Sequence, residues 1–430
     1  MEKLFIVSGA QLSGEVQLSG SKNAALAIMA GALLAPGKTI LHNVPRISDM
    51  NTMIAMLNSL GVPSKFVGTH TVTIDATNIR TCEAPYELVR KMRASFSVLG
   101  PIVARCGEAR VPVPGGCDIG ARPVNFHIDG LRRLGARIDV EHGLYAANAQ
   151  RLQGTNIYLD FQSAGATQHL MTAAGLAVGT TTIENAATEP EIVDLANFLK
   201  AMGVKIEGAG TPTIIINGVE ELTPIEYTII PDRMEAGTFA IAAGITRGDI
   251  FIRGAVEEHM KPVITKLGEA GVQHSVESDG IRFRRSGRIR PVTIKTMPHP
   301  SFPTDLQQPF AAMLCVADGT STITENVYES RFRYINELNR MGADIHVEGR
   351  TAVINGVPRL TGAPVTATDL RAGAALIIGG LVAEGETEIS GVDHIDRGYE
   401  DIAGKLAGLG ALIRRGDEVE NNEGVHVCSI

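Results

Sequence analysis

A repeat of about seventy residues runs through the 430-residue chain and restricts the folds open to it. The pattern Leu-x-x-Leu/Met-Gly-Ala/Val recurs along the sequence, with one degenerate copy, LGEAGV, at 267–272. Its glycines are Gly61, Gly135, Gly203, Gly271, Gly342 and Gly410. A second glycine series closes an apolar run in each unit: Gly37, Gly107, Gly179, Gly248, Gly319 and Gly385. In both series successive glycines are 66 to 74 residues apart, which predicts six copies of one structural unit.

Each unit predicts two helices and several strands. In the first unit, residues 21–37 predict a helix that ends at Gly37, because glycine suits a helix C-cap. Residues 38–44 then predict a strand, and the second helix ends in the repeated pattern. Alternating segments predict strands with one buried face: TVTID at 71–75, IRFRR at 281–285 and TAVIN at 351–355.

The first helix of each unit is apolar on every side. Residues 24–35 and 372–383 contain no charged side chain, and such a helix belongs in the interior of a protein. The sequence therefore predicts an inverted α/β (α+β) fold in which helices fill the inside and half-exposed sheets form the outside. Because 430 residues exceed what one core usually holds, the six units divide as three and three, with a cleft between two domains.

Composition excludes several classes of function. The net charge of −8, with acidic and basic residues interspersed, argues against a nucleic-acid partner. The apolar runs are too short to span a bilayer, and residues 1–23 lack a signal-peptide pattern, so we expect a soluble, cytoplasmic protein without a membrane partner. Residues 418–430 predict a disordered tail. The scattered cysteines indicate neither a disulfide framework nor a zinc site: Cys82, Cys106, Cys117, Cys315 and Cys428.

The second unit differs from the others around Cys117. Its two marker glycines are 28 residues apart, against 23 to 25 in the other units. The extra residues fall in a segment rich in Gly and Pro, which predicts a functional loop. Arg122 and His127 would favour the thiolate of Cys117, and the flanking glycines would grant access to it. The alternative is a tolerated surface insertion with an incidental thiol.

Cations stand near the starts of several helices or turns, where the helix dipole disfavours positive charge by roughly 0.3–1 kcal/mol each. A bound phosphate or carboxylate would offset this repulsion, so these positions predict an anionic ligand. The alternative is ordinary capping at solvated helix ends, which suits Asp232 and Asp369. The cations are Lys22, Arg93, Arg371 and Arg397.

Four motifs resemble one family closely: GSKNAAL at 20–26, PGGCDIGARPVNFH at 114–127, FPTDLQ at 302–307 and DRGYE at 396–400. The chain is similar to the UDP-N-acetylglucosamine 1-carboxyvinyltransferases, which are enolpyruvyl transferases, from its first residues to about residue 415. The resemblance implies two domains of three βαβαββ units each. It places residues 22–230 in one domain, with a mobile cysteine loop at about 112–123, and residues 1–21 plus 231–430 in the other.

The resemblance also implies a reaction. Members of this family transfer the enolpyruvyl group of phosphoenolpyruvate to the 3′-hydroxyl of UDP-N-acetylglucosamine and release phosphate, by addition and elimination. This is the first committed step of peptidoglycan synthesis in the cell wall. Both substrates are small molecules, and no metal or organic cofactor is implied. The oligomeric state stays open.

By likeness to the family motifs, Cys117 is the general acid that protonates the vinyl carbon, and it is the residue that fosfomycin alkylates. Asp305 is expected near the 3′-hydroxyl, as a base or a proton relay. The phosphoenolpyruvate clamp would comprise Lys22, Arg122 and Arg397, with Asn23 beside them and Arg371 as a further substrate-binding cation. The nucleotide-sugar site would comprise Arg93, Arg122, Pro123, Val124, Asn125, Phe126, Phe161, Gln162, Ser163, Ala164 and Val327.

Two positions depart from the family pattern: Asp118 stands where a small residue is usual, and Asn125 stands where Asp is common. Two other functions stay open. One is 5-enolpyruvylshikimate-3-phosphate synthase, which shares the fold and mechanism but lacks the reactive cysteine and has GSKS in place of GSKN. The other is a catalytically silent paralogue that binds nucleotide sugar and regulates by protein contact.

Overall fold

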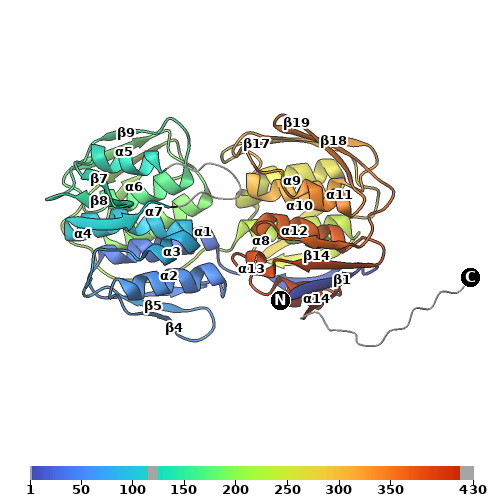
Figure 1. The fold of residues 1–430 in the computed structure, drawn as a ribbon, viewed down its shortest axis with the longest axis horizontal. Helices are drawn as coiled ribbons and strands as arrows, with labels where there is room; N and C mark the ends of the chain where they lie inside the picture. The colour runs from blue at the N-terminus through green and yellow to red at the C-terminus, as the bar shows by residue number, and fades with distance from the viewer. Residues whose placement is uncertain (1, 115–123, 417–430) are drawn as a thin grey trace, which may run out of the picture.

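The computed structural model describes residues 2–114 and 124–416. Within these ranges the chain forms six small sheets with helices between them, in two halves that lie side by side (Figure 1). Six sheets are what the glycine repeat predicts. The loop around Cys117 and the tail from residue 418 lie outside the described residues.

The first half of the chain is built mainly from residues 22–230. Its helices are α1 (Lys22–Gly31), α2 (Ser48–Ser59), α3 (Tyr86–Lys91), α4 (Leu99–Cys106), α5 (Asn125–Arg133), α6 (Ala164–Ala174) and α7 (Pro190–Met202), with 3₁₀ turns η1 (Ala32–Leu34) and η2 (Arg93–Val98). Its strands are β3 (Lys38–His42), β4 (Ser64–Phe66), β5 (Val72–Asp75), β6 (Glu108–Pro112), β7 (Arg137–Glu141), β8 (Leu144–Asn148), β9 (Asn156–Tyr158), β10 (Thr180–Glu184), β11 (Lys205–Glu207), β12 (Thr213–Asn217) and β13 (Glu226–Thr228).

The second half contains the remaining elements. Its helices are α8 (Arg233–Ile245), α9 (Glu257–Ala270), α10 (Thr304–Leu314), α11 (Ile335–Arg340), α12 (Leu370–Gly380), α13 (Val392–Ile395) and α14 (Ile402–Gly408). Its strands are β1 (Lys3–Val7), β2 (Ser13–Gln17), β14 (Asp249–Arg253), β15 (Gln273–Glu277), β16 (Gly280–Arg284), β17 (Thr293–Thr296), β18 (Thr320–Glu325), β19 (Asp344–Glu348), β20 (Thr351–Asn355), β21 (Pro364–Thr366), β22 (Glu386–Ser390) and β23 (Leu412–Gly416).

Five of the six sheets within the described residues share one topology, and the sheet β6-β8-β7 has only the two antiparallel pairings. In the sheet β11-β12-β10-β9, strand β9 runs parallel to β10, and β12 pairs antiparallel with both β10 and β11. The sheet β17-β18-β20-β19 repeats this arrangement. Strand β20 alternates between buried and half-buried residues, as the pattern TAVIN predicts. The repeated sequence unit is therefore a repeated structural unit.

The two ends of the chain complete the same sheet. Strand β1 lies between β22 and β23 and is antiparallel to both. The chain then crosses to the first half at residues 19–21 and returns at residues 230–232. The two crossings are hydrogen-bonded to each other, since the Ser21 N–H donates to the Ile230 carbonyl at 2.7 Å and the Asp232 N–H donates to the Ser19 carbonyl at 2.9 Å.

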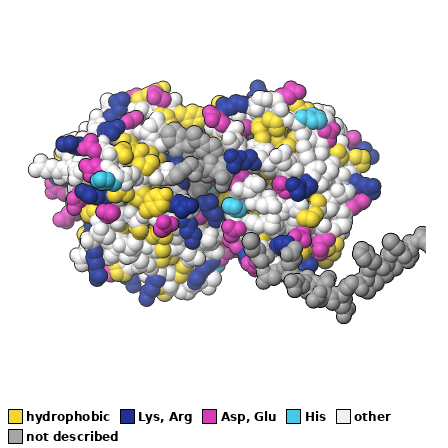
Figure 2. Space-filling view, viewed as in Figure 1, with side chains coloured by type: hydrophobic (Ala, Val, Ile, Leu, Met, Phe, Trp, Pro, Cys, Tyr) yellow, Lys and Arg dark blue, Asp and Glu magenta, His cyan; other side chains and the backbone are white. Residues whose placement is uncertain are grey.

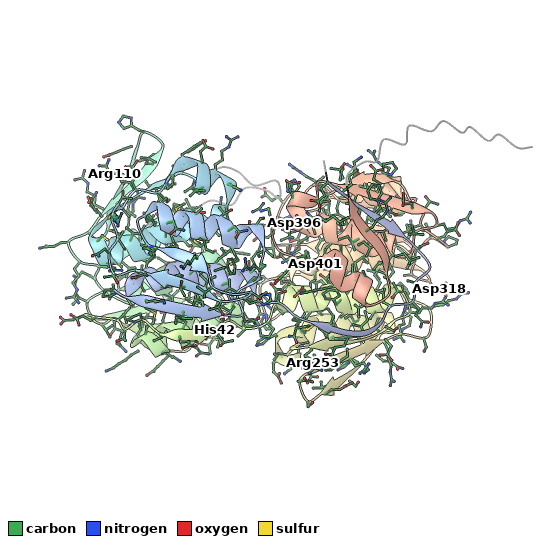
Figure 3. All side chains as sticks on the ribbon, turned by 90° about the horizontal axis from the view of Figure 1, so that it is seen from below. His42, Arg110, Arg253, Asp318, Asp396 and Asp401 are labelled. Atoms are coloured by element: carbon green, nitrogen blue, oxygen red, sulfur yellow. The ribbon has the colours of Figure 1, made fainter. Side chains whose placement is uncertain are left out.

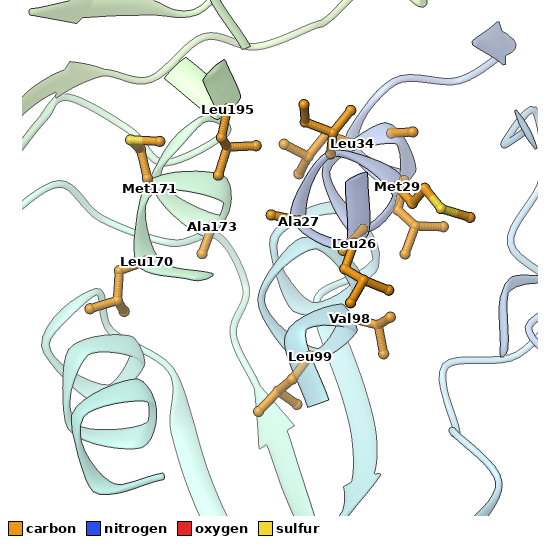
Figure 4. Packing of buried hydrophobic residues seen from close by; sticks show 14 of the residues in the cluster. Leu26, Ala27, Met29, Leu34, Val98, Leu99, Leu170, Met171, Ala173 and Leu195 are labelled. Carbon is orange, nitrogen blue, oxygen red and sulfur yellow. The ribbon is translucent and has the colours of Figure 1, made fainter. Parts of the chain in front are cut away.

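The apolar first helices of the units lie in the interior, as predicted. Every residue of α1 from Ala24 to Gly31 is buried, and so is every residue of α8 from Met234 to Ile245. Figure 4 shows Leu26, Leu99 and Leu170, from three different helices, in one apolar core. The described residues form two such cores, one within 24–229 and one from 4–18 and 234–411. The division into domains 22–230 and 1–21 plus 231–430 stays a proposal, which these separate cores support.

The prediction that the first helix of each unit ends at its second-series glycine is wrong for most units. Helix α4 does end there, with Gly107 as its left-handed cap, but α1 and η1 stop at Leu34, before Gly37. Pro36 is the reason, because a residue before proline avoids the helical region, and Ala35 is accordingly extended. Glycines of the other series do lie at helix ends, with φ between 78° and 121°: Gly61, Gly135, Gly203, Gly271, Gly342 and Gly410.

Charged side chains of both signs mix over the face shown in Figure 2, with several basic ones near the junction of the two halves. Figure 3 places Asp396 and Asp401 on the side of the second half that faces the first. There the Ser48 N–H donates to the Asp396 carbonyl at 2.9 Å, which ties α2 to the second half. Within the described ranges, no helix has the length and apolar character needed to cross a membrane.

Candidate active site

A cavity of about 500 Å³ opens between the two halves. The first half contributes the start of α1, the turn η2 and the N-terminus of α6 to its wall. The second half contributes residues 297–305, ahead of and into α10, and residues 327–328 after β18. The cavity lies where the predicted cleft would be, and two clusters of charged residues adjoin it.

The first charged cluster joins Lys22 and Arg397 through Asp49. Lys22 is the first residue of α1, and its Nζ lies 3.5 Å from Asp49 Oδ2. Arg397 follows α13 in the second half, and its Nε donates to Asp49 Oδ1 at 3.0 Å. Asp49 and Lys22 are largely buried, whereas the Arg397 side chain is 41% exposed. One carboxylate thus holds two cations from opposite halves of the molecule.

Burial and four neighbouring charged groups set the pKa of Lys22. Burial lowers the pKa of Lys22, and Asp49 opposes that shift, while Arg371 and Arg397 add to it. Both arginines therefore lie close enough to repel the Lys22 ammonium. Three cations that converge in this way form a positive site that an anion would stabilise.

The second charged cluster surrounds Asp305, the second residue of α10. Arg331 Nη2 donates to Asp305 Oδ1 at 2.5 Å, and Arg371 Nη2 donates to Oδ2 at 3.1 Å. The side chains of both arginines are buried, with 3% and 5% exposure, but that of Asp305 is 28% exposed and lines the cavity. The two buried arginines therefore fix the Asp305 carboxylate, while its exposed part faces the cavity.

Arg371 is held by the cap of its own helix and by the ring of Tyr399, in addition to Asp305. Asp369, the N-cap of α12, accepts from the Arg371 N–H at 2.8 Å. The guanidinium lies 5.3 Å from the centre of the Tyr399 ring, and the Tyr399 hydroxyl pairs with Thr238 Oγ1 at 2.7 Å. Burial would lower the pKa of Arg371, but Tyr399 and Asp305 together raise it. Arg371 therefore stays charged near neutral pH.

Asn23, predicted beside the phosphoenolpyruvate clamp, and Asp305, predicted near the 3′-hydroxyl, line the cavity. Most residues predicted for the nucleotide-sugar site line it too: Arg93, Val124, Phe126, Phe161, Gln162, Ser163, Ala164 and Val327. Asn125 instead lines a neighbouring cavity of about 430 Å³, which shares Arg93 and Val124 with the first. Lys22, Arg371 and Arg397 lie in the two charged clusters. Cys117, Arg122 and Pro123 lie outside the described residues.

Three contacts at this site were not predicted from the sequence. Asp49 and Arg331 have no motif around them, because an acid in the first turn of α2 has an ordinary local explanation. On the far wall of the cavity, Arg233 Nε donates to Glu191 Oε1 at 3.0 Å, and both side chains are nearly buried. This pair connects α8 of the second half with α7 of the first.

Comparisons with known proteins agree on one family. The family model for EPSP synthase (3-phosphoshikimate 1-carboxyvinyltransferase) matches residues 6–406. The UDP-N-acetylglucosamine 1-carboxyvinyltransferase 1 of Halalkalibacterium halodurans is 52% identical over 98% of this chain and 96% of its own length. The UDP-N-acetylglucosamine 1-carboxyvinyltransferase 2 of Carboxydothermus hydrogenoformans is 53% identical over 96% of this chain and 99% of its own.

Solved structures support the same family. The enolpyruvyl transferase NikO from Streptomyces tendae superposes with a TM-score of 0.86 at 28% identity, covering 96% of this chain and 98% of its own. EPSP synthase from Acinetobacter baumannii superposes with a TM-score of 0.78, covering 97% of this chain and 100% of its own. Because the identity to that protein is only 18%, this second likeness concerns the fold alone.

Proposed function

The chain belongs to the EPSP synthase family of enolpyruvyl transferases, and from this premise we propose that it is a UDP-N-acetylglucosamine 1-carboxyvinyltransferase. It transfers the enolpyruvyl group of phosphoenolpyruvate to the 3′-hydroxyl of UDP-N-acetylglucosamine, releases phosphate, and so serves peptidoglycan synthesis. Within the family, this choice rests on sequence identity: the chain is 52–53% identical, over almost its whole length, to proteins of that name. Identity to a solved EPSP synthase is only 18%.

We propose that phosphoenolpyruvate binds where Lys22, Arg371 and Arg397 converge. Its phosphate and carboxylate would relieve the mutual repulsion of these cations, which is one reason that the pKa of Lys22 is lowered. Asp49 already orients Lys22 and Arg397, so little reorganisation is needed when the anion arrives. Arg122, outside the described residues, is proposed as a further member of this clamp.

Asp305 is proposed to take the proton of the 3′-hydroxyl, directly or through a relay. An alcohol is a weak nucleophile at neutral pH, so the attack on C2 of phosphoenolpyruvate needs a base. The two buried arginines hold both oxygens of Asp305 in a fixed orientation at the cavity wall. Val327 lines the same cavity and is proposed to contact the nucleotide sugar, whereas Asn23, which also lines it, is proposed to lie beside the phosphoenolpyruvate clamp.

Cys117 is proposed as the general acid, and this role rests on the family motif PGGCDIGARPVNFH. Its proton adds to the methylene carbon of phosphoenolpyruvate while the sugar oxygen bonds to C2. The resulting methyl group then loses a proton, which restores the double bond. At the same time the bond between C2 and the phosphate oxygen breaks, and phosphate is released. Protonation at carbon builds positive charge at C2, which the fixed anionic and polar groups of the site stabilise.

The proposed function predicts that purified protein releases inorganic phosphate from phosphoenolpyruvate only when UDP-N-acetylglucosamine is present. A coupled phosphate assay measures this directly, with UDP-glucose as a matched control that lacks the N-acetyl group. Release with shikimate 3-phosphate in place of the nucleotide sugar would assign the chain to the sister activity. If no phosphate is released with either acceptor, the chain would be a silent paralogue that binds the nucleotide sugar.

The lowered pKa of Lys22 predicts a pH dependence for phosphoenolpyruvate binding. Only the protonated ammonium attracts the substrate, and its proton is lost at a lower pH than from a free lysine, whose pKa is about 10.4. The KM for phosphoenolpyruvate is therefore expected to rise with pH within the alkaline range below that value. Lys22→Arg keeps its charge there and should show no such rise. Steady-state kinetics at fixed ionic strength checks this, and parallel profiles for the two proteins would contradict it.

A further inference from the structure

A buried histidine and a half-buried one form a pair in the cavity wall. His127, from the first turn of α5, and His169, from α6, face each other with their Nδ1 atoms 3.0 Å apart. Phe96 packs against both rings, with its centre 5.6 Å from that of His127 and 5.8 Å from that of His169. All three residues line the cavity between the halves.

The backbone fixes which nitrogens of this pair carry protons. The Gly100 N–H donates to His169 Nε2 at 2.6 Å, and a backbone amide can only donate. His169 Nε2 is therefore unprotonated, so the proton of the neutral ring is on Nδ1, which donates to His127 Nδ1. The remaining proton of His127 is then on Nε2. A side chain at position 100 would prevent this contact, because a Cβ there would lie 2.7 Å from His169 Nε2.

Both rings are neutral near pH 7. Burial lowers the pKa of His127 to about 3, with a further contribution from the nearby Arg93. Burial also lowers the pKa of His169 well below 6.5, with a contribution from His127. The charged group that acts on the pair is thus Arg93, and a proton on His127 would further disfavour a proton on His169. The tautomers of the two neutral rings, and not a net charge, therefore decide whether the pair offers the cavity a hydrogen-bond donor or an acceptor.

The protonated edge of His127 faces the start of α6. A Cβ on Gly165 would lie 3.6 Å from both Cε1 and Nε2 of His127, so this edge lies directly beside the first turn of α6. Arg93 and Ser163 line the same region of the cavity. N–H donors from a helix N-terminus, an arginine and a neutral imidazole suit a phosphate group.

We propose that His169 is a positioning residue that locks His127 in its Nε2–H form, so that His127 donates a hydrogen bond to the diphosphate of UDP-N-acetylglucosamine. This inference rests on the proposed function, because it takes the nucleotide sugar as the ligand. In the opposite tautomer His127 would present a lone pair to the phosphate oxygens and repel them. The fixed Nε2–H tautomer of His127 therefore favours binding of the nucleotide sugar and adds no positive charge next to Arg93.

An isosteric pair of variants tests the lock. His169→Asn keeps an amide N–H where Nδ1 donates, whereas His169→Leu has a shape close to that of asparagine but lacks the donor. The KM for UDP-N-acetylglucosamine is expected to rise roughly tenfold in His169→Leu, the value of one hydrogen bond to a charged group. In His169→Asn it should stay within about twofold of the wild type. The KM for phosphoenolpyruvate and kcat should change little in either variant.

Histidine ¹⁵N NMR on the wild-type protein supplies a readout that does not depend on activity or on the variants' folding. His127 should show protonated Nε2 and unprotonated Nδ1 without ligand, and the Nε2 signal should shift when UDP-N-acetylglucosamine is added. Protonated Nδ1, an unshifted Nε2 signal, or equal KM values in the Leu and Asn variants would each overturn the proposal. Wild-type protein that releases no phosphate with UDP-N-acetylglucosamine would instead refute the proposed function, while the ligand-free tautomer would still test the lock.

Discussion

Asp305→Asn is expected to lower kcat by about 10²–10⁴-fold, the usual contribution of a positioned acid–base group. Asparagine has nearly the same shape and its one carbonyl oxygen can still accept from one of the two arginines, Arg331 or Arg371, but it cannot take the proton of the 3′-hydroxyl. If Asp305 only anchored the arginines, the loss would be far smaller and would follow the stability of the protein. Single-turnover phosphate release separates the chemical step from binding.

The matched control for this change is Asp396→Asn. Asp396 also pairs with an arginine, Arg415, but its side chain is 34% exposed, and Asp396 is not among the residues that line the cavity. Its replacement should leave kcat within about twofold, because an exposed ion pair contributes little to stability. Thermal melting of both variants shows how much folded protein remains. A kcat for Asp305→Asn close to that of the control would mean that another group is the base.

Cys117→Ser is expected to reduce turnover by about 10²–10⁴-fold and to abolish inactivation by fosfomycin. A serine hydroxyl is a much weaker acid than a thiol, so it cannot readily protonate the vinyl carbon of phosphoenolpyruvate. It is also a poor nucleophile toward fosfomycin, which alkylates this cysteine in the family that the chain resembles. Steady-state rates and the mass of the protein after fosfomycin treatment measure the two effects.

Cys106→Ser is the control for the thiol itself. Cys106 is a free, exposed cysteine at the end of α4 and is not among the residues that line the cavity. This variant should keep wild-type turnover and remain sensitive to fosfomycin. A Cys117→Ser protein with wild-type activity would show that the acid has been assigned to the wrong residue, whatever the fold of the chain.

The sequence predicted the repeat architecture because each unit carries its own local signals. An all-apolar helix must be buried, and a glycine at a helix end can adopt positive φ, as Gly61 and Gly135 do. The ends of the first helices were predicted less well. An apolar run such as residues 24–35 does not reveal where the hydrogen-bonding pattern stops, and at α1 it is Pro36 that sets the limit.

The cavity wall was also predictable in part. Residues within recognisable motifs, such as Asn23 and Asp305, do line it. Asp49 and His169 could not be found in this way, because their roles depend on partners far along the chain. Asp49 meets Arg397 across 348 positions, and His169 meets Gly100 across 69. Such contacts exist only after the halves have folded, and no local pattern encodes them.

The position of β1 between β22 and β23 sets the order in which the protein can be completed on the ribosome. Once β13 has been translated, the lobe with Lys22 and Arg93 has all its strands and can fold as a unit. Residues 3–7 emerge first of all, but their neighbours on both sides are among the last segments synthesised. The sheet that contains β1 can therefore be completed only near the end of translation, after β22 and β23 have been synthesised.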